Sequence, residues 1–588
     1  MGGGRLGTVG YGRLMLLVAG LGGLLYGIDV GIIGGALPYL EATSNLNRGQ
    51  ISIIVAAVLL GSIFSTLFAG LLADWMGRKP LMLISGIAFS ISVPIIALSH
   101  GFTPLFLGRL LQGMSGGFVG VVVPLYLAEC LAANVRGKGT GIFQWLLTLG
   151  IFVAALIGIY TSYHVAEIAK IASPQALFAA KDNAWRSIFW MSLPPGLLFI
   201  GTAFFISESP RWLFSRGRVE AARAALERSR EPEQAALEMR EMEEIAARGK
   251  AGAAAKDSLL SRRYVIPFLL ACVILACNTA TGINSIIGYN VDILIQSGLS
   301  DVLAHWGYVL FTFMNFVMTI VGLQLVDKKG RKFLLTIGTS GIIVALVTVG
   351  TLFSRTEKKR YDARDAAQAL IANGDSLSIK FDSAEARQLG APSVNGQQSL
   401  AVIYSYGDFT SSTKPALLGD VEPVTIDRSN SIPSSKVEAF FQNPFANLSA
   451  ARTAPLKIEH AYITPVPSIA NGWAVAICLY VFIAFFAMGP GVCVWLALSE
   501  LMPTRIRSNG MSVALVLNQT VSTALAAIFL PVVGKYGYST MFYLFAAFTV
   551  VYFITAAFFL PETKGKTLEE IEHFFVRGQQ KSAPALAP

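Results

Sequence analysis

Two copies of one pattern decide the fold of this chain: "GLLADWMGRK", residues 70–79, and "GLQLVDKKGRK", residues 322–332. In each copy an aspartate lies four positions before the arginine of a Gly-Arg-Lys group, so Asp74 of the first corresponds to Asp327 of the second. Internal similarity at a long offset is typical of architectures built from structural repeats. The chain is therefore predicted to consist of two related halves.

A second repeated pattern supports the duplication. "AECLAANVRG", residues 128–137, returns as "SELMPTRIRS", residues 499–508, and the glutamate of each, Glu129 or Glu500, precedes an arginine by seven positions. The separation from the repeated aspartate to the repeated glutamate is 55 residues in the first half and 173 in the second. The surplus of 118 residues matches the polar stretch 354–471, which is predicted to be an insertion.

The composition places both halves in a membrane. Of the 588 residues 54% are hydrophobic and 14% are charged, whereas soluble domains carry about 25% charged residues. Apolar stretches of about twenty residues, enough to cross a hydrocarbon core of about 30 Å as a helix, recur along the chain. We predict an all-α membrane protein with twelve transmembrane helices in two six-helix halves. The predicted spans are 13–36, 51–73, 80–98, 104–131, 139–161, 185–206, 264–294, 303–326, 333–353, 472–498, 509–533 and 538–560.

The segments between the spans suggest how the chain is organised. The linker is rich in Ala, Glu and Arg, which favours short amphipathic helices on the membrane surface over an independent domain. The insertion mixes Pro, Gly, Ser and Asn, and we expect a partly ordered loop in preference to a small domain. A longer outer loop is expected at 162–184. The predicted parts are the N-terminal half at 1–206, cytoplasmic linker helices at 207–263, three helices of the C-terminal half at 264–353, the extracytoplasmic insertion at 354–471, the last three helices at 472–560 and a cytoplasmic tail at 561–588.

Lysine and arginine in the short loops predict the orientation. With the N-terminus in the cytoplasm, ten of these residues fall inside and four outside, so both termini are predicted to be cytoplasmic. Basic inner loops facing anionic lipid account for the net charge of +10 without a nucleic acid partner. The inner set is Arg78, Lys79, Arg136, Lys138, Lys328, Lys329, Arg331, Lys332, Arg505 and Arg507, and the outer set is Arg48, Lys170, Lys181 and Lys535.

The sequence has no nucleophile-and-base set, phosphate-binding loop or paired Cys/His group at a diagnostic spacing. An enzyme and an ATP-driven pump are therefore disfavoured, and we expect neither a cofactor nor a metal.

Two ionisable residues stand out within the predicted spans: Asp29, in "LLYGIDVGIIGG" at 24–35, and Arg109 in the fourth span. Each costs roughly 2.5–3.5 kcal/mol at a helix centre on insertion scales, so each is a functional candidate. One interpretation is a static pair that fixes helix packing. We favour the other, in which the carboxylate exchanges its arginine partner for a proton and thereby couples proton entry to a conformational change.

Neutral amides and hydroxyls form a second set inside the spans. Amides offer donors and acceptors, which suits the hydroxyls of a sugar or polyol and suits a cation poorly, while a tryptophan face packs on C–H groups. Each residue could instead join two helices, but their spread over four helices favours a midplane site between the halves. In "TATGIN", residues 279–284, a glycine inside the seventh span predicts either a broken helix or a simple kink. The set is Gln144, Asn278, Thr279, Thr281, Asn284, Asn315, Asn518 and Gln519, and the tryptophan considered beside it is Trp495.

The cytoplasmic repeats have a mechanical interpretation. Their acids and arginines lie at helix ends, where ion pairs to the opposite half would bias inward-open against outward-open states. Positive-inside topology alone is the alternative, and the acids paired at a repeated spacing favour a gate.

These motifs together resemble the sugar porters of the major facilitator superfamily, over nearly the whole chain outside 354–471. The resemblance rests on "GLLADWMGRK", "GRLLQGMSGG", "PLYLAECLAANVRG", "SESPRW", "TGIN", "VDKKGRK", "GPGVCVWLALSELMPTRIR" and "PETKG". It implies the major facilitator fold and a role for Asp29 and Arg109 in proton coupling. The positions that match sugar contacts in the family are Gln144, Asn284, Asn315, Trp495 and Asn518. The positions that match the family's cytoplasmic charge network are Asp74, Arg78, Glu129, Arg136, Glu208, Arg211, Asp327, Arg331, Glu500 and Arg507.

Departures from the family pattern fall among the residues expected to meet the sugar. The usual paired glutamines before the Gly-Ile-Asn group are here Asn278 and Thr279, and the usual tryptophan after Asn518 is Gln519. The identity of the sugar therefore stays open. We expect a monomeric carrier in a lipid bilayer, a bacterial inner membrane, that imports a monosaccharide (hexose or pentose) with a proton by alternating access. A proton-independent sugar facilitator, a polyol or inositol porter, and a sugar sensor with a transporter-like body are the alternatives.

Overall fold

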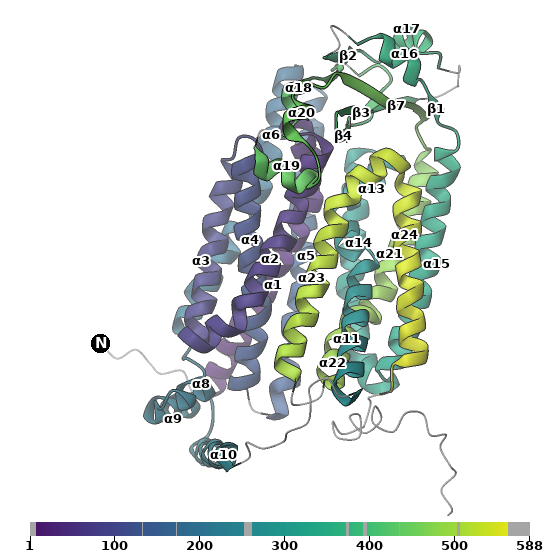
Figure 1. Cartoon of the computed structure of the whole chain (residues 1–588). Helices are drawn as coiled ribbons and strands as arrows, with labels where there is room; N and C mark the ends of the chain where they lie inside the picture. The colour runs from purple at the N-terminus through teal and green to yellow at the C-terminus, as the bar shows by residue number, and fades with distance from the viewer. Residues whose placement is uncertain are drawn as a thin grey trace, which may run out of the picture.

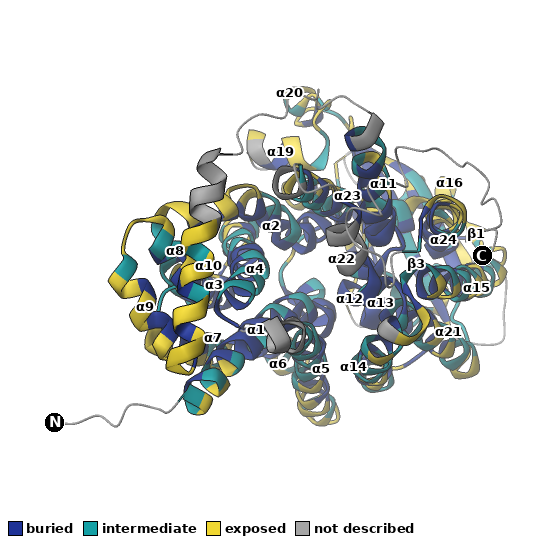
Figure 2. Cartoon of the chain, turned by 90° about the horizontal axis from the view of Figure 1, so that it is seen from below, coloured by how far each residue is buried: buried dark blue, intermediate teal, exposed yellow. Residues whose placement is uncertain are grey.

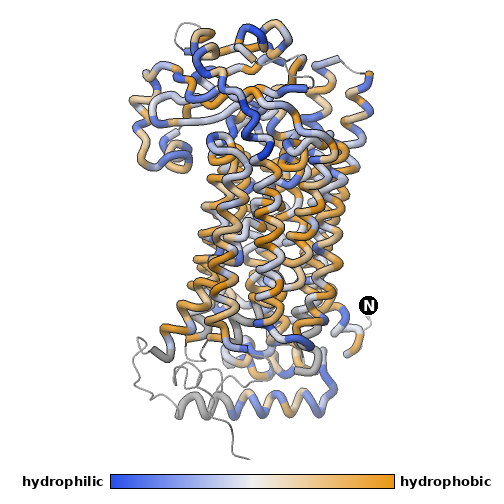
Figure 3. The backbone as a smooth tube through the Cα atoms, turned by 90° about the vertical axis from the view of Figure 1, so that its right-hand side faces the viewer, coloured by the Kyte–Doolittle hydropathy of each residue, from blue (hydrophilic) through white to orange (hydrophobic). Residues whose placement is uncertain are grey.

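The computed structural model describes residues 8–562 except 132, 172, 252–261, 372–374, 392–396, 421, 434 and 503–505. The side chains of 133–140, 245–251, 262–263, 327, 437, 495–500 and 507–509 also lie outside the description. Within the described part, twelve helical segments are long and apolar enough to cross a membrane, as the sequence predicts. Apolar residues form a band along the bundle, and polar residues gather at its two ends (Figure 3).

The first six spans are α1 (Thr8–Thr43), α2 (Arg48–Met76), α3 (Arg78–Ala97), α4 (Phe102–Cys130), α5 (Ala133–Ala169) and α6 (Pro174–Trp190) with α7 (Leu193–Phe205). The last six are α11 (Arg262–Ala280) with α12 (Ile283–Gly288) and α13 (Asn290–Gln296), α14 (Asp301–Lys329), α15 (Arg331–Glu357), α21 (Ile469–Met488) with α22 (Pro490–Leu501), α23 (Arg507–Tyr536) and α24 (Tyr538–Ile554) with the π-helical turn η1 (Thr555–Phe559).

The two sets of spans form two bundles that lie side by side (Figure 1). Three linker helices, α8 (Pro210–Ser215), α9 (Val219–Glu227) and α10 (Pro232–Ala251), lie at one end of the bundles, which we call the linker end. The insertion lies at the other end, which we call the insertion end. Seen from the linker end, exposed residues lie on the linker helices and on the outward sides of the spans, while buried residues line the facing sides of the spans (Figure 2).

The expected long loop at 162–184 is wrong. α5 continues to Ala169 and α6 begins at Pro174, so helix fills most of this stretch. Ser173 accepts a hydrogen bond from the Ala176 amide and so caps the start of α6. Hydropathy detects only the apolar part of a helix, and both helices continue past it into a polar region.

The repeated sequence pattern corresponds to a repeated helix cap. Gly77 precedes α3 with φ +104°, and Glu208 accepts hydrogen bonds from the Arg78 and Lys79 amides at 3.0 and 3.2 Å. In the second half, Gly330 precedes α15 with φ +89°, and Glu562 accepts from the amides of the next two residues at 3.1 and 3.3 Å. A side chain at either glycine would collide with the capping carboxylate, so the pattern requires glycine.

The opposite ends of these helices are also fixed. Glu357, the last residue of α15, accepts hydrogen bonds from the amide and the hydroxyl of Ser539 at the start of α24. In the first half, Arg186 of α6 donates to the carbonyls of Ala97 and Ser99 at the end of α3, at 2.8 and 2.9 Å. α15 is therefore joined to α24 at both ends, and α3 is joined at both ends to the sixth span.

The insertion is folded, so the expected partly ordered loop is wrong and the alternative, a small domain, fits. β1 (Tyr361–Asp362), β7 (Leu456–Pro465), β3 (Gln398–Tyr406) and β4 (Phe409–Ser412) form an antiparallel sheet in this order, and β5 (Ala416–Leu417) pairs with β3. β2 (Leu377–Ile379) and β6 (Val424–Ile426) form a second, two-stranded sheet. Five short helices complete it: α16 (Arg364–Ala369), α17 (Ser383–Gln388), α18 (Arg428–Ser431), α19 (Lys436–Gln442) and α20 (Leu448–Ala451).

The insertion has an apolar core of its own. Leu400, Val402 and Tyr406 of β3 pack with Ile458 and Ala461 of β7, and all five are buried. Alternate residues of β3 face one side of the sheet, and a register shift in its pairing with β7 brings Ile458 and Ala461 to that same side. β4 contacts α2 of the first half and α23 of the second, so the insertion lies over the ends of both bundles.

Candidate functional site

Asp29 on α1 and Arg109 on α4 lie next to each other inside the first half. Arg109 Nη1 lies 4.0 Å from Asp29 Oδ1, and 1% of each residue is exposed. Gly116 of α4 leaves room for the Asp29 side chain, because an added Cβ there would lie 2.8 Å from Asp29 Oδ2. Arg109 also donates to Gln112 Oε1 at 2.7 Å, and its guanidinium lies over the ring of Phe189. The sequence predicted these two residues as a pair, and the structure brings them together.

The carboxylate of Asp29 has few partners. Within the described part of the chain neither of its oxygens accepts a hydrogen bond. A buried carboxylate without hydrogen bonds is costly, and either a nearby cation or a bound proton offsets that cost. The geometry therefore suits an acid that alternates between the guanidinium and a proton.

Gln519 of α23 extends from the second half toward this pair. Its Nε2 donates to Ser62 Oγ on α2 at 3.3 Å. Tyr26, three residues before Asp29 on α1, lies against both Ser62 and Gln519. Gln519 was predicted as a sugar-contacting residue, and it also provides a direct polar link between the halves beside Asp29.

α11, α12 and α23 bring several of the predicted amides and hydroxyls together. Thr279 Oγ1 donates to the carbonyl of Asn518 at 3.2 Å, and Asn518 Nδ2 donates to a backbone carbonyl of α11 at 2.8 Å. Asn284 Nδ2 donates to Ser522 Oγ at 2.6 Å. Asn278 is 5% exposed, and its Oδ1 accepts no hydrogen bond from the described residues. These side chains form a polar cluster within the second half that retains an unused acceptor.

Gln144 and Asn315 lie on α5 and α14, which pack against each other across the two halves. Trp145 stacks on Phe316 with ring centroids 5.3 Å apart, so the residues next to the two amides meet at this contact. Asn315 is buried and Gln144 is half-buried. The side chain of Trp495 lies outside the described residues.

The seventh span is broken, not merely kinked. Gly282 has φ +85°, in the left-handed region, and separates α11 from α12. Thr281 Oγ1 donates to the Asn278 carbonyl at 2.7 Å and so provides a hydrogen bond to a backbone carbonyl next to the break. The ring of Phe545 packs directly on Gly282, where a Cβ would collide with it. Such interruptions in transporters expose backbone near a ligand.

Contacts between the halves at the insertion end are buried and polar. Arg48 of α2 lies 3.7 Å from Asp292 of α13, and both side chains are less than 10% exposed. Tyr39 of α1 donates to Asp301 of α14 at 2.8 Å. Tyr308 donates to a carbonyl of α1 at 2.8 Å. The insertion end is therefore closed in this structure.

These insertion-end residues were missed by the sequence analysis. Asp292 lies in the apolar run "VDILIQ" at 291–296, and an isolated carboxylate in such a run was the signal that identified Asp29. Arg48 was counted only as an outer loop residue. Asn47, which precedes Arg48, caps α2 through its side chain and thereby places Arg48 in the first turn.

At the linker end, Arg78 of the predicted gate forms ion pairs with acids of its own half. Arg78 donates through Nε and Nη2 to the two oxygens of Glu129, at 2.9 and 2.8 Å, and Nη2 lies 3.0 Å from Asp74 Oδ1. Arg211 is exposed, and Arg331 donates a side-chain hydrogen bond to the carbonyl of Val326 at 3.4 Å. The side chains of Arg136, Asp327, Glu500 and Arg507 lie outside the described residues.

Glu208 is a half-buried member of the linker-end network. Besides capping α3, it accepts a hydrogen bond from the Ser209 amide at 2.7 Å. Burial raises the pKa of Glu208, and the backbone hydrogen bonds from Ser209, Arg78 and Lys79 partly oppose this.

A duplicated twelve-helix bundle with ionisable and amide side chains buried inside it defines a membrane transporter of the major facilitator type. The family described as "Sugar (and other) transporter" matches residues 15–372 and 453–575, and between these two segments lies the middle of the insertion. The chain belongs to this family of sugar transporters.

Known relatives agree with this assignment. The chain is 27% identical to the glucose transporter GlcP of Staphylococcus epidermidis over 95% of this chain and 96% of the relative. It is 26% identical to the human proton myo-inositol cotransporter over 97% of this chain and 82% of the relative. Among solved structures, a partially occluded inward-open form of the xylose transporter XylE from E. coli has a TM-score of 0.63 at 19% identity, covering 95% of this chain and 99% of that one.

Proposed function

We propose that this chain imports a monosaccharide, a hexose or pentose, together with a proton by alternating access. The observation that carries the proposal is the Asp29–Arg109 pair, buried at 4.0 Å with both carboxylate oxygens free of hydrogen bonds from the described residues. Protonation of Asp29 would weaken its attraction to Arg109, and Gln519 and Ser62 lie close enough to pass that change to the second half.

The sugar would bind between the halves, against Gln144 and Asn315 on one pair of helices and the cluster of Asn278, Thr279, Asn284 and Asn518 on the other. Amides that donate and accept in fixed directions match the hydroxyls of a neutral sugar. Trp495 would supply an apolar face for its C–H groups. Both termini and the linker helices would lie in the cytoplasm of a bacterium, and a single chain would suffice for transport.

The test is uptake into proteoliposomes by Asp29→Asn. Asparagine at position 29 cannot gain or lose a proton as a carboxylate does, so the variant should lose accumulation against a gradient and keep exchange of labelled sugar across the membrane. Asp182→Asn, at a partly exposed carboxylate paired with Arg186 on the same helix, is the matched control and should accumulate normally. Undiminished accumulation by Asp29→Asn would contradict the coupling role.

A polyol such as inositol is the second candidate substrate. Two observations favour it: several relatives carry names of inositol transporters, and Asn278 and Thr279 are shorter than the paired glutamines usual at these positions. Competition of unlabelled glucose, xylose and myo-inositol against one labelled sugar would rank the three. Transport that is equally fast with and without a pH gradient would indicate a facilitator.

A further inference from the structure

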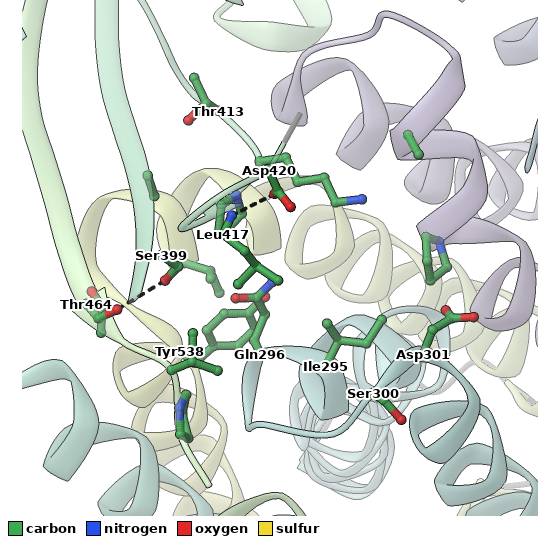
Figure 4. A pocket seen from close by; sticks show the side chains of 18 of the residues that line it. Ile295, Gln296, Ser300, Asp301, Ser399, Thr413, Leu417, Asp420, Thr464 and Tyr538 are labelled. Carbon is green, nitrogen blue, oxygen red and sulfur yellow. Dashed lines mark hydrogen bonds between the residues drawn. The ribbon is translucent and has the colours of Figure 1, made fainter. Parts of the chain in front are cut away.

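A large cavity lies between the insertion and the ends of the bundles, apart from the amide cluster within the spans. We call it the insertion cavity. Its volume is about 660 Å³, within the range of small-molecule sites. In Figure 4, Ser399 and Thr464 border it from the sheet, Leu417 and Asp420 from the insertion's loops, and Asp301 and Tyr538 from the helices.

The lining can recognise a neutral, hydroxyl-rich molecule. Its positive and negative side chains nearly balance, so the cavity has little net field to select an ion. Hydroxyl, amide and carboxylate groups offer both donors and acceptors, and tyrosine rings offer faces for C–H groups. The positively charged lining residues are Arg48, Lys181, Arg360 and Lys414, and the negatively charged ones are Asp301, Glu357 and Asp420.

Two buried polar groups in the lining have unused hydrogen-bonding capacity. Arg48 and Ser412 are each 6% exposed. Arg48 Nε and Ser412 Oγ make no hydrogen bond to the described residues. Buried polar groups are rarely left without partners, so their presence in one lining points to a ligand that would pair with them.

The insertion cavity lies over the closed contact between the halves. Arg48 and Tyr538 belong both to its lining and to that contact, because Arg48 pairs with Asp292 and Tyr538 donates to Asp292 at 2.5 Å. The insertion is attached to the first half by a hydrogen bond from Gln50 to Glu438. On the second half, Ser412 packs against Gly534 near the end of α23.

A second chamber of about 550 Å³ continues the cavity on the side of the first half. It shares Arg48, Lys181, Ser412, Lys414 and Asp420 with the first chamber. Any opening of the closed contact must move Arg48, so it must also change the wall common to both chambers.

We propose that the insertion cavity is a second binding site for a neutral sugar or polyol, where substrate binds before it passes the Arg48–Asp292 contact. Ser412 and Arg48 donate hydrogen bonds to its hydroxyls, and Asp420 accepts from them. The proposal rests on the proposed function of the chain as a sugar importer. It assigns to the insertion the role of an entry site, distinct from the amide cluster within the spans.

Leu417→Trp tests the proposal, because it fills the cavity from the side of the insertion and leaves every residue of the spans unchanged. The full-length protein in nanodiscs is dialysed against labelled D-glucose, D-xylose and myo-inositol. Two molecules per chain should bind to the unmodified protein and one to the variant. Phe445→Trp, at an insertion residue that is 95% exposed and outside both chambers, should still bind two. A single molecule bound to every form would overturn the proposal.

Ser412→Ala is the milder variant and keeps the proposal testable if the tryptophan disturbs folding. It should weaken the second binding event about fivefold, the loss expected for one hydrogen bond. Its neighbour Ser411 faces the other side of β4 and lies outside both chambers, so Ser411→Ala should leave both events unchanged. If Ser412→Ala and Ser411→Ala bind the second sugar molecule with equal affinity, Ser412 does not contact the ligand and the proposal is contradicted.

Transport assays separate this proposal from the proposed function. Leu417→Trp should lower uptake at low sugar concentration and leave the saturated rate unchanged, whereas Phe445→Trp should change neither. Uptake that is identical in all forms overturns the entry site and leaves the importer intact. Absence of any sugar flux overturns the importer, and binding of D-gluconate in place of neutral sugars overturns the ligand class assigned here.

Discussion

The two ends of the bundle use their charges in opposite ways. At the insertion end, Arg48 and Asp292 join the two halves and are buried. At the linker end, Arg78 pairs with Glu129 and Asp74 of its own half, and Asp74 is largely exposed. A buried pair between halves resists separation strongly, while a pair within one half permits it. Among the side chains that the structure describes, this difference identifies the insertion end as the closed gate.

The substitution Arg48→Met should have the largest effect on the difference between the two ends. The substitution leaves Asp292 and the neighbouring Glu41 without their cation. Removing one member of a buried ion pair costs about 3–5 kcal/mol of stability. We expect a loss of this size in thermal unfolding of the protein in nanodiscs, together with greater opening of the insertion end.

The double variant Arg48→Met/Asp292→Leu is the control, because removing both partners of a buried pair is often nearly neutral. It should recover a large part of the lost stability. Losses that simply add in the double variant would show that the two residues do not interact across the halves.

The repeated helix caps at the linker end offer a smaller effect. Glu208→Gln and Glu562→Gln each weaken the cap of one helix, α3 or α15. Each should lower stability by about 1 kcal/mol, the usual contribution of a cap. Thermal unfolding measures both, with Glu220→Gln on the exposed face of α9 as the control. Unequal losses would mean that the two halves are not held in the same way.

The smallest expected effect is a pH dependence from Glu208. Because burial raises the pKa of Glu208 in the folded chain, the folded state binds this proton more tightly than the unfolded state does. Its contribution to stability is therefore greatest at low pH and falls as the pH rises from the ordinary glutamate value, about 4.3, through the raised value. Unfolding measured over this window should show the fall in the unmodified protein and not in Glu208→Gln. A fall of equal size in Glu208→Gln would assign the pH dependence to other groups.

Much of the fold could be predicted because its signals are local. The repeated Asp-x-x-x-Arg pattern predicts the duplication, and isolated charges in apolar runs single out Asp29 and Arg109. The insertion could not be predicted in the same way. Five of its strands have only two to four residues, too few to show alternation. The longer β3 is buried at five consecutive positions, which hides the alternation there. Only the pairing of β3 with the distant β7 creates its core.

The closed gate also escaped prediction, for a tertiary reason. Asp292 lies in α13, whose direction depends on the interruptions at Gly282 and Tyr289. Only that geometry brings it to Arg48, which lies more than two hundred residues earlier in the chain. Likewise, the residue types of the amide cluster are enough to predict its members as candidate sugar ligands. The hydrogen bond from Gln519 to Ser62 could not be predicted, because it depends on how α23 packs against α2.

The double attachment of α15 to α24, and of α3 to the sixth span, has a consequence for how the protein moves. Glu357 and Glu562 hold the first pair at its two ends, and Arg186 and Glu208 hold the second. Neither pair can slide or hinge internally without breaking charged hydrogen bonds. Each pair should therefore move as a rigid unit at the edge of its half, with slow amide exchange along its length. The conformational change of transport should then take place mainly in α1, α4 and α11.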